Sequence, residues 1–118
     1  MLAAVDMGTN SFHMVVVRAD NQGRFQLIDT GKEDVRLGSG SPDMSVITPD
    51  AEERALAAMK RFKILAETRN AEMRVVATSA VREARNRRTF VRRVLEITGA
   101  SRVYSFVASR GEEGKIGR

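Results

Sequence analysis

Residues 2–17 read LAAVDMGTNSFHMVVV, two apolar, β-prone runs on either side of a short polar segment. Glycine, asparagine and serine between two such runs favour a tight reversal, so the stretch predicts a β-hairpin that turns over Asp6–Ser11. A second reversal over Asp20–Gly23 leads into a mixed segment, Phe25–Asp29. We therefore expect three successive strands, the last at the outside.

A loop and then a helix follow these strands. Residues 31–49 are rich in Gly, Ser and Asp, which is typical of a loop in which residues 35–37 pair briefly. Thr48-Pro49-Asp50 then supplies an N-cap, a proline for the first turn and a favourable negative charge. One apolar face at helical spacing predicts a core-facing helix: Ala55, Leu56, Met59, Phe62, Leu65 and Ala66.

The remaining elements complete an α/β pattern. Met73–Ala77 reads as a short buried strand that follows the helix, which indicates a parallel crossover. A second helix should run from an Asn86 cap to Gly99, before a last strand over Val103–Val107. The predicted order is βββαβαβ, a mixed sheet with helices packed on it. We treat residues 1–118 as one domain, in which residues 108–118 form a tail of uncertain structure.

Composition narrows the class of protein. The 118 residues are 42% hydrophobic and 30% charged, which is ordinary for a single globular domain. The lack of cysteine excludes disulfides and thiolate metal sites, and the single histidine argues against zinc. The sequence has no basic leader and no apolar run of the ~18 residues that cross a bilayer, so we expect a cytoplasmic protein with no membrane partner.

Positive charge is concentrated in one segment. Residues 82–93 hold six arginines and one glutamate, a net +5 that equals the charge of the whole chain. Such a cluster suits a polyanionic partner, although it is also typical of a solvated helix face. Phe90 is the only aromatic residue in the cluster and its spacing places it in the core, which argues against nucleic acid as the partner.

The polar segment of the first hairpin holds the candidate chemistry. Its backbone N–H groups and hydroxyls can point at a phosphate, and Gly8 allows close approach. Asp6 can hold a Mg²⁺-bound water or orient an attacking water. The alternative is an ordinary hairpin turn, for which the same residue types are favoured. His13, beside this turn, is either a proton carrier or, more commonly for such a residue, a packed side chain.

Several segments resemble the exopolyphosphatase/guanosine pentaphosphate phosphohydrolase family. These are AVDMGTNSFHMV at 4–15, KEDVRLG at 32–38, the helix at 53–62 and VATSAVREARN at 76–86, so the resemblance covers roughly residues 3–100. It implies a ribonuclease-H-like subdomain of the actin-like ATPase superfamily. It also implies Mg²⁺-assisted phosphate release from long polyphosphate or from guanosine pentaphosphate.

The resemblance assigns roles to individual residues. Asp6, Gly8, Asn10 and Ser11 match the family's first phosphate loop, and Thr9 replaces a serine while keeping the hydroxyl. Arg82 matches an arginine that contacts phosphate, a task for which its planar, two-pronged group is suited.

The end of the chain departs from the family pattern. The family has a catalytic glutamate on a helix after the last strand, and direct register with RGEEGK at 110–115 puts Gly114 in its place. A slip of one residue makes Glu113 the catalytic acid, while Glu112 and an inert tail remain alternatives.

The second glycine-rich phosphate loop of actin-like proteins has no match in this sequence, which predicts an incomplete enzyme. The alternatives are a non-catalytic, basic module that binds polyphosphate or nucleotides, and half of another actin-like ATPase or sugar kinase. An unpaired strand edge over residues 24–30 further suggests self-association.

Overall fold

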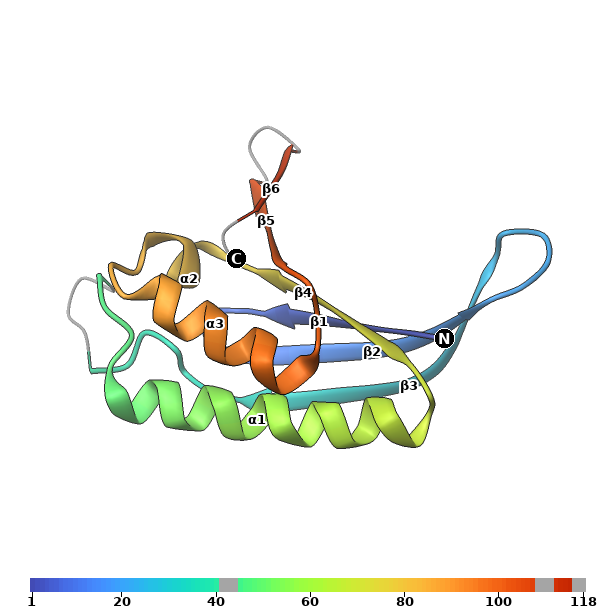
Figure 1. The fold of residues 1–118 in the computed structure, drawn as a ribbon, viewed down its shortest axis with the longest axis horizontal. Coiled ribbons are helices and arrows are strands. Elements are labelled where there is room, and N and C mark those ends of the chain that lie inside the picture. Colours follow the sequence, from blue (N-terminus) through green and yellow to red (C-terminus); the bar gives the residue numbers. More distant parts are fainter. Residues whose placement is uncertain (41–44, 108–111, 116–118) are drawn as a thin grey trace.

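A six-stranded mixed sheet with helices on one face makes up the fold (Figure 1). The computed structural model describes residues 1–40, 45–107 and 112–115. The strands lie in the order β3-β2-β1-β4-β5-β6. Along the chain the elements are β1 (Leu2–Met7), β2 (Ser11–Ala19), β3 (Phe25–Asp34), α1 (Pro49–Thr68), β4 (Glu72–Ala77), α2 (Ser79–Glu83), α3 (Arg87–Thr98), β5 (Val103–Val107) and β6 (Glu112–Lys115). The predicted order is confirmed, and α2 and β6 are added to it.

The first three strands form the predicted antiparallel meander. β1 pairs with β2 from Leu2↔Val17 to Met7↔Phe12, and β2 pairs in turn with β3. β3 is longer than predicted because residues 30–34 continue the ladder to the start of β2. Gly31 permits this, since a Cβ at that position would lie 3.0 Å from the Phe62 ring of α1.

The second predicted reversal closes the β2–β3 hairpin. The backbone N–H groups of Arg24 and Gln22 donate to the Asp20 carboxylate at 2.9 and 2.8 Å. These two bonds lower the pKa of the Asp20 carboxyl below its usual value. The turn is therefore stabilised while Asp20 is ionised, and this contribution is lost as the pH falls through the folded-state pKa.

The second half of the sheet is parallel. α1 carries the chain from β3 to β4, which lies parallel to β1 in the register Leu2↔Glu72 to Met7↔Ala77. α2 and α3 then lead to β5, which is parallel to β4. β6 turns back and pairs antiparallel with β5. The predicted parallel crossover is thus confirmed.

The two faces of the sheet differ. Alternate strand residues are buried against the helices: Ala3, Val5, Met7, Phe12, Met14, Val16, Met73, Val75, Ala77 and Val103. The predicted stripe of α1 packs on them, with Ala55, Met59, Phe62 and Ala66 buried and Leu56 and Leu65 partly buried. The opposite face, hereafter the open face, carries exposed side chains such as Asp6, His13 and Arg74.

The helix ends follow the sequence signals with one exception. Thr48 Oγ1 accepts the Ala51 N–H at 3.3 Å ahead of Pro49, and Gly99 closes α3 with a φ of 73°. Asn86 stands at the start of α3, but its side chain makes no capping bond. Instead it accepts from Ile47 N at 3.0 Å and donates to Ile47 O at 2.8 Å. The prediction of a side-chain cap at Asn86 is wrong because this distant backbone takes both of its polar atoms.

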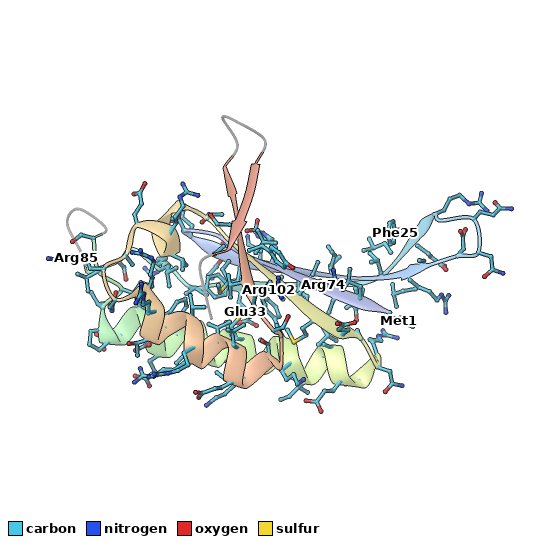
Figure 2. All side chains as sticks on the ribbon, turned by 45° about the horizontal axis from the view of Figure 1, so that its top comes forward. Met1, Phe25, Glu33, Arg74, Arg85 and Arg102 are labelled. Atoms are coloured by element: carbon cyan, nitrogen blue, oxygen red, sulfur yellow. The ribbon has the colours of Figure 1, made fainter. Side chains whose placement is uncertain are left out.

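The outer strand of the meander is an open edge, as expected. Among the described strands β3 pairs with β2 alone, and Phe25 and Leu27 are 69% and 61% exposed. Phe25 lies on the part of the hairpin that extends away from the helices (Figure 2). Self-association through this edge remains a prediction. No helix within the described ranges is both long and apolar enough to span a membrane.

Candidate phosphate-binding site

The polar loop of the first hairpin lies where the sheet changes its direction of winding. After β1 the chain turns to β2 on one side, whereas after β4 it continues to β5 on the other, and β1 and β4 are neighbours. In open α/β sheets, ligands bind at the carboxyl ends of strands at such a point. The loop at 8–10 and the start of α2 both lie there.

Gly8 is required by the shape of the loop. A Cβ on Gly8 would lie 2.6 Å from the backbone oxygen of Ser11, closer than real Cβ contacts come. Only glycine therefore lets the chain fold back this tightly between β1 and β2. This agrees with the role of Gly8 in the predicted loop, although the constraint comes from the protein's own backbone.

Residues 35–37, distant in sequence, hold the loop by donating N–H groups to the carbonyl groups of the loop. Asn10 O accepts the N–H groups of Val35 and Arg36 at 3.0 and 2.8 Å, and Thr9 O accepts that of Leu37 at 2.8 Å. Val35 and Leu37 are buried, so this segment is anchored in the core. The predicted brief pairing of residues 35–37 is therefore real, and its partner is the loop.

The backbone donors of the loop are left available. Within the described part of the chain, the N–H groups of Thr9 and Asn10 have no acceptor. Successive unsatisfied N–H groups in a turn form a concave site that attracts anions. The Ser11 hydroxyl is occupied instead, because it donates to Asp34 Oδ1 at 2.9 Å. The loop can thus offer main-chain donors to a phosphate, while Ser11 braces it.

Asp6 lies beside the loop on the open face. It pairs across the strands with His13 on β2 and Val76 on β4, and both Asp6 and His13 are exposed. His13 is therefore not a packed residue, and that interpretation is wrong. Among the described residues no group of three or more His, Cys, Asp or Glu side chains could hold a metal ion. A single exposed carboxylate still fits Mg²⁺, which commonly takes one or two carboxylates, waters and substrate phosphates.

Arg82, on α2, lies at the same carboxyl end of the sheet as the loop. Thr78 fixes the start of α2 to the end of β1, because its N–H and Oγ1 donate to Met7 O at 3.3 and 3.1 Å. Arg82 is half-buried and its Nη1 donates to Ser105 Oγ on β5 at 3.1 Å. Ser105 is only 2% exposed, so this bond anchors the guanidinium to the buried part of β5. Two predicted phosphate-binding elements, the loop and Arg82, thus lie at the carboxyl ends of neighbouring strands.

The other arginines of the 82–93 segment lie elsewhere. Arg93 Nη1 bonds Glu52 Oε2 at 2.8 Å and Arg87 Nη1 donates to Ala84 O at 3.2 Å. Arg88 and Arg92 are exposed on α3. The arginines of α3 therefore belong to the surface of that helix, whereas the side chain of Arg82 bonds a strand of the sheet.

The predicted catalytic acid lies on a strand rather than on a helix. β6 includes Glu112 and Glu113, whose Cα partners on β5 are Val107 and Phe106. Gly114 pairs with Ser105, the partner of Arg82, so the backbone of β6 runs close to that arginine. The side chains of Glu112 and Glu113 lie outside what the structure describes, and the catalytic role of Glu113 remains a prediction.

Sequence reasoning missed the residues that support the site. Thr78 and Ser105 hold α2 and Arg82 in place, and neither was expected to do so. The signal for Thr78 was its position directly after a buried strand. Ser105 had no signal of its own, since a serine within an apolar strand does not reveal its partner.

Comparison with known proteins agrees with this architecture. A profile of the Ppx/GppA phosphatase family matches residues 15–113. An exopolyphosphatase from Cytophaga hutchinsonii is 28% identical with a TM-score of 0.83, over 92% of this chain and 35% of that one. An exopolyphosphatase-like protein is 29% identical with a TM-score of 0.82, over 92% and 33%.

The Aquifex aeolicus PPX-GPPA enzyme shares the fold at 24% identity, with a TM-score of 0.80 over 92% of this chain and 36% of that one. The chain thus spans about a third of the length of these solved structures.

Proposed function

Since the chain belongs to the Ppx/GppA phosphatase family, we propose that it supplies one wall of a Mg²⁺-assisted phosphohydrolase site for polyphosphate or guanosine pentaphosphate. The observation that carries the proposal is the loop held by its carbonyls with the N–H groups of Thr9 and Asn10 available, at the same sheet edge as Arg82. The similarity to an exopolyphosphatase favours polyphosphate.

Each group has a task that follows from its chemistry. The two loop N–H groups bind oxygens of the terminal phosphate, and the Arg82 guanidinium neutralises its charge. Asp6 would hold Mg²⁺ through water, and the ion would supply positive charge that offsets the charge of the phosphate oxygens. Glu113 is the proposed base for the attacking water, with His13 beside Asp6 as a second proton acceptor.

Replacing Arg82 with alanine should weaken the binding of tripolyphosphate about tenfold, because one charge-assisted hydrogen bond contributes about 1.5 kcal/mol. Calorimetric titration at low salt measures this change, and high salt should reduce the affinity of the unmodified protein. Arg88→Ala is the matched control, since Arg88 is exposed on α3. Thermal melts of both variants show whether loss of the Arg82–Ser105 bond has unfolded the domain. Equal affinity of Arg82→Ala and the unmodified protein would exclude Arg82 from the site.

Replacing Asp6 with asparagine should remove any Mg²⁺-dependent gain in phosphate affinity while leaving the fold intact. The amide keeps the shape of the side chain and loses its charge, and Asp6 is exposed with no hydrogen bond in the described structure. Titration of tripolyphosphate with and without Mg²⁺ measures the gain. Glu67→Gln, an exposed acid on α1, is the control. A persistent Mg²⁺ effect would rule out Asp6 as its holder, and a large drop in melting temperature would assign it a structural role.

A further inference from the structure

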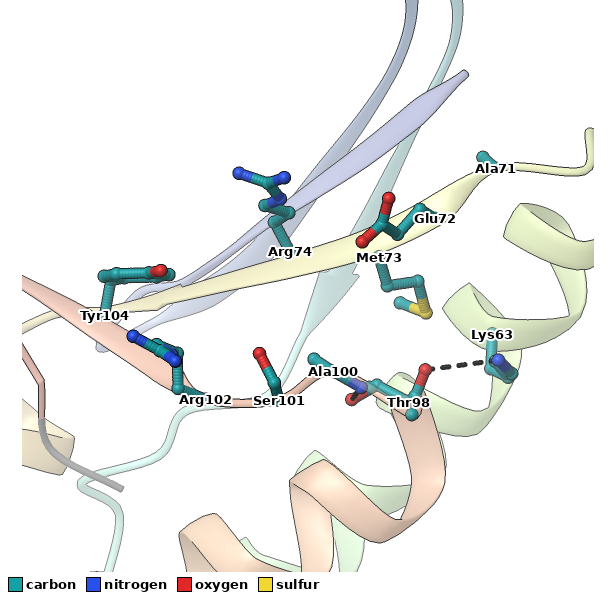
Figure 3. Close-up of a pocket in the computed structure, with 11 residues that line it drawn as sticks. Lys63, Ala71, Glu72, Met73, Arg74, Thr98, Ala100, Ser101, Arg102 and Tyr104 are labelled. Atoms are coloured by element: carbon teal, nitrogen blue, oxygen red, sulfur yellow. Dashed lines mark hydrogen bonds between the residues drawn. The ribbon is translucent and has the colours of Figure 1, made fainter. Parts of the chain in front are cut away.

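A cavity opens between β4 and β5 at the end of the sheet opposite the loop. The two strands pair only from Val75↔Val103 onward, and before that point the chain segments diverge. The space between them has a volume of about 460 Å³ (Figure 3). Glu72 and Arg74 line it from β4, while Ser101, Arg102 and Tyr104 line it from the α3–β5 connection and β5.

The charge of this cavity is positive. Lys63, Arg74 and Arg102 line it together with one acid, Glu72. Lys63 donates to Thr98 O at 3.1 Å and so satisfies the carboxyl end of α3 (Figure 3). In the described part of the chain neither Arg74 nor Arg102 has a hydrogen bond or an ion pair with an acid, unlike Arg61 and Arg93, which bind Glu33 and Glu52.

Two arginines from different elements line this cavity, Arg74 on β4 and Arg102 just before β5. Arg74 and Arg102 are labelled close together in Figure 2, whereas Arg85 lies at the far end of the molecule. Both line the same cavity, although they are far apart in sequence. Two like charges at one cavity, neither of them bonded to an acid in the described structure, repel each other, and an anion bound there would offset this repulsion.

The lining also suits an oxyanion in shape. Gly99, Ala100 and Ser101 form one wall without large side chains, and the N–H groups of Gly99 and Ala100 donate to Leu95 O and Thr98 Oγ1. The hydroxyl groups of Ser101 and Tyr104 are further donors at the cavity. The volume is that of about fifteen waters at ~30 Å³ each, which is enough for a short chain of phosphate groups.

We propose that this cavity is a second oxyanion site, which binds a phosphate group or a short condensed phosphate between Arg74 and Arg102. The fork of an arginine matches two oxygens of a phosphate, and a phosphate has enough oxygens for two such forks whereas a carboxylate has only two oxygens. The site is separate from the loop, because the six residues of β4 span five steps of ~3.3 Å, which places its two ends about 17 Å apart. A single orthophosphate therefore cannot occupy both.

Amide shifts in two-dimensional NMR spectra test this proposal on the whole chain. Titration with orthophosphate, tripolyphosphate and guanosine triphosphate at low salt should shift the amides of Gly99, Ala100 and Ser101 to saturation. The amides of Thr9 and Asn10 report the loop separately, so failure of the proposed function and failure of this site are distinguishable. The three probes show whether a free phosphate, a condensed phosphate or a nucleotide is preferred.

Charge variants give the sign of the effect. Arg74→Gln and Arg102→Gln should each weaken binding at the cavity about tenfold. Glu72→Gln should strengthen binding severalfold, because it removes the one acid among the described residues that line the cavity. Arg88→Gln on α3 should change nothing. Arg102→Lys keeps the charge and should retain more affinity than Arg102→Gln. This comparison separates loss of charge from loss of stability, should either variant be less stable. Cavity amides that do not saturate, or that saturate equally in the Arg74→Gln/Arg102→Gln double variant, would overturn the proposal.

Discussion

The purified chain should release orthophosphate from long-chain polyphosphate at least about 10²- to 10³-fold more slowly than a full-length relative, because loss of even one preorganised stabilising group costs that much. All the proposed phosphate donors, the N–H groups of Thr9 and Asn10 and the Arg82 guanidinium, lie at the carboxyl ends of the central strands of one sheet. Phosphoryl transfer depends on charge stabilisation from several directions. The solved relatives are about three times as long, which leaves room for an opposing wall.

Orthophosphate release in the presence of Mg²⁺ measures this deficit. The assay compares the chain alone, a full-length relative, and the chain mixed with the remaining part of that relative expressed separately. Recovery of turnover in the mixture would support a site shared between two parts. Tight binding of polyphosphate without turnover in any mixture would support the non-catalytic binding module instead. Robust turnover by the chain alone would refute the interpretation of this edge as one wall of a site.

Local sequence signals were enough for most of the fold. The hairpin over Asp6–Ser11, the cap at Thr48 and the terminating Gly99 each depend on residues within a few positions of one another. The parallel crossover followed from the helix that precedes β4, although the sequence did not name β1 as its neighbour. Each of these features is specified by backbone preferences and by the spacing of apolar residues, which a sequence displays directly.

The errors arose where a distant partner decides the outcome. Asn86 is a residue type that often caps helices, but the backbone of Ile47, 39 positions away, bonds both the oxygen and the nitrogen of its amide. β3 continues past Asp29 because Gly31 fits against Phe62 and Arg61 bonds Glu33 at 2.7 Å. These contacts form only after α1 has packed on the sheet, so no local pattern reveals them.

The candidate site likewise has parts that the sequence indicated and parts that it did not. The resemblance to a phosphatase family identified the loop and Arg82, because their residue types stand in consecutive positions. It did not reveal that residues 35–37 hold the loop by its carbonyls or that Ser105 anchors Arg82. His13 was expected to be packed, but the alternation of β2 turns it to the open face. These contacts and this exposure depend on how the strands assemble into the sheet.

Replacing Gly8 with alanine should weaken tripolyphosphate binding about a hundredfold, because the affinity depends on the two loop N–H groups that this change displaces. The new Cβ would lie 2.6 Å from Ser11 O, so the backbone on one side must move. The three hydrogen bonds to residues 35–37 resist that movement. Two misaligned N–H bonds to a charged group, at about 1.5 kcal/mol each, correspond to about two powers of ten in affinity.

The same substitution should lower the free energy of unfolding by about 1–3 kcal/mol, the usual cost of an atom forced into an occupied space. Urea denaturation measures this loss, and calorimetric titration of the folded variant measures the change in affinity. Gly23→Asn is the matched control, because Gly23 has nothing within 4 Å of its Cβ position and asparagine tolerates its φ of +78°. If Gly8→Ala kept both the midpoint and the affinity of the unmodified protein, the loop would be free to relax. Its N–H groups would then not be the preorganised donors on which the phosphate site depends.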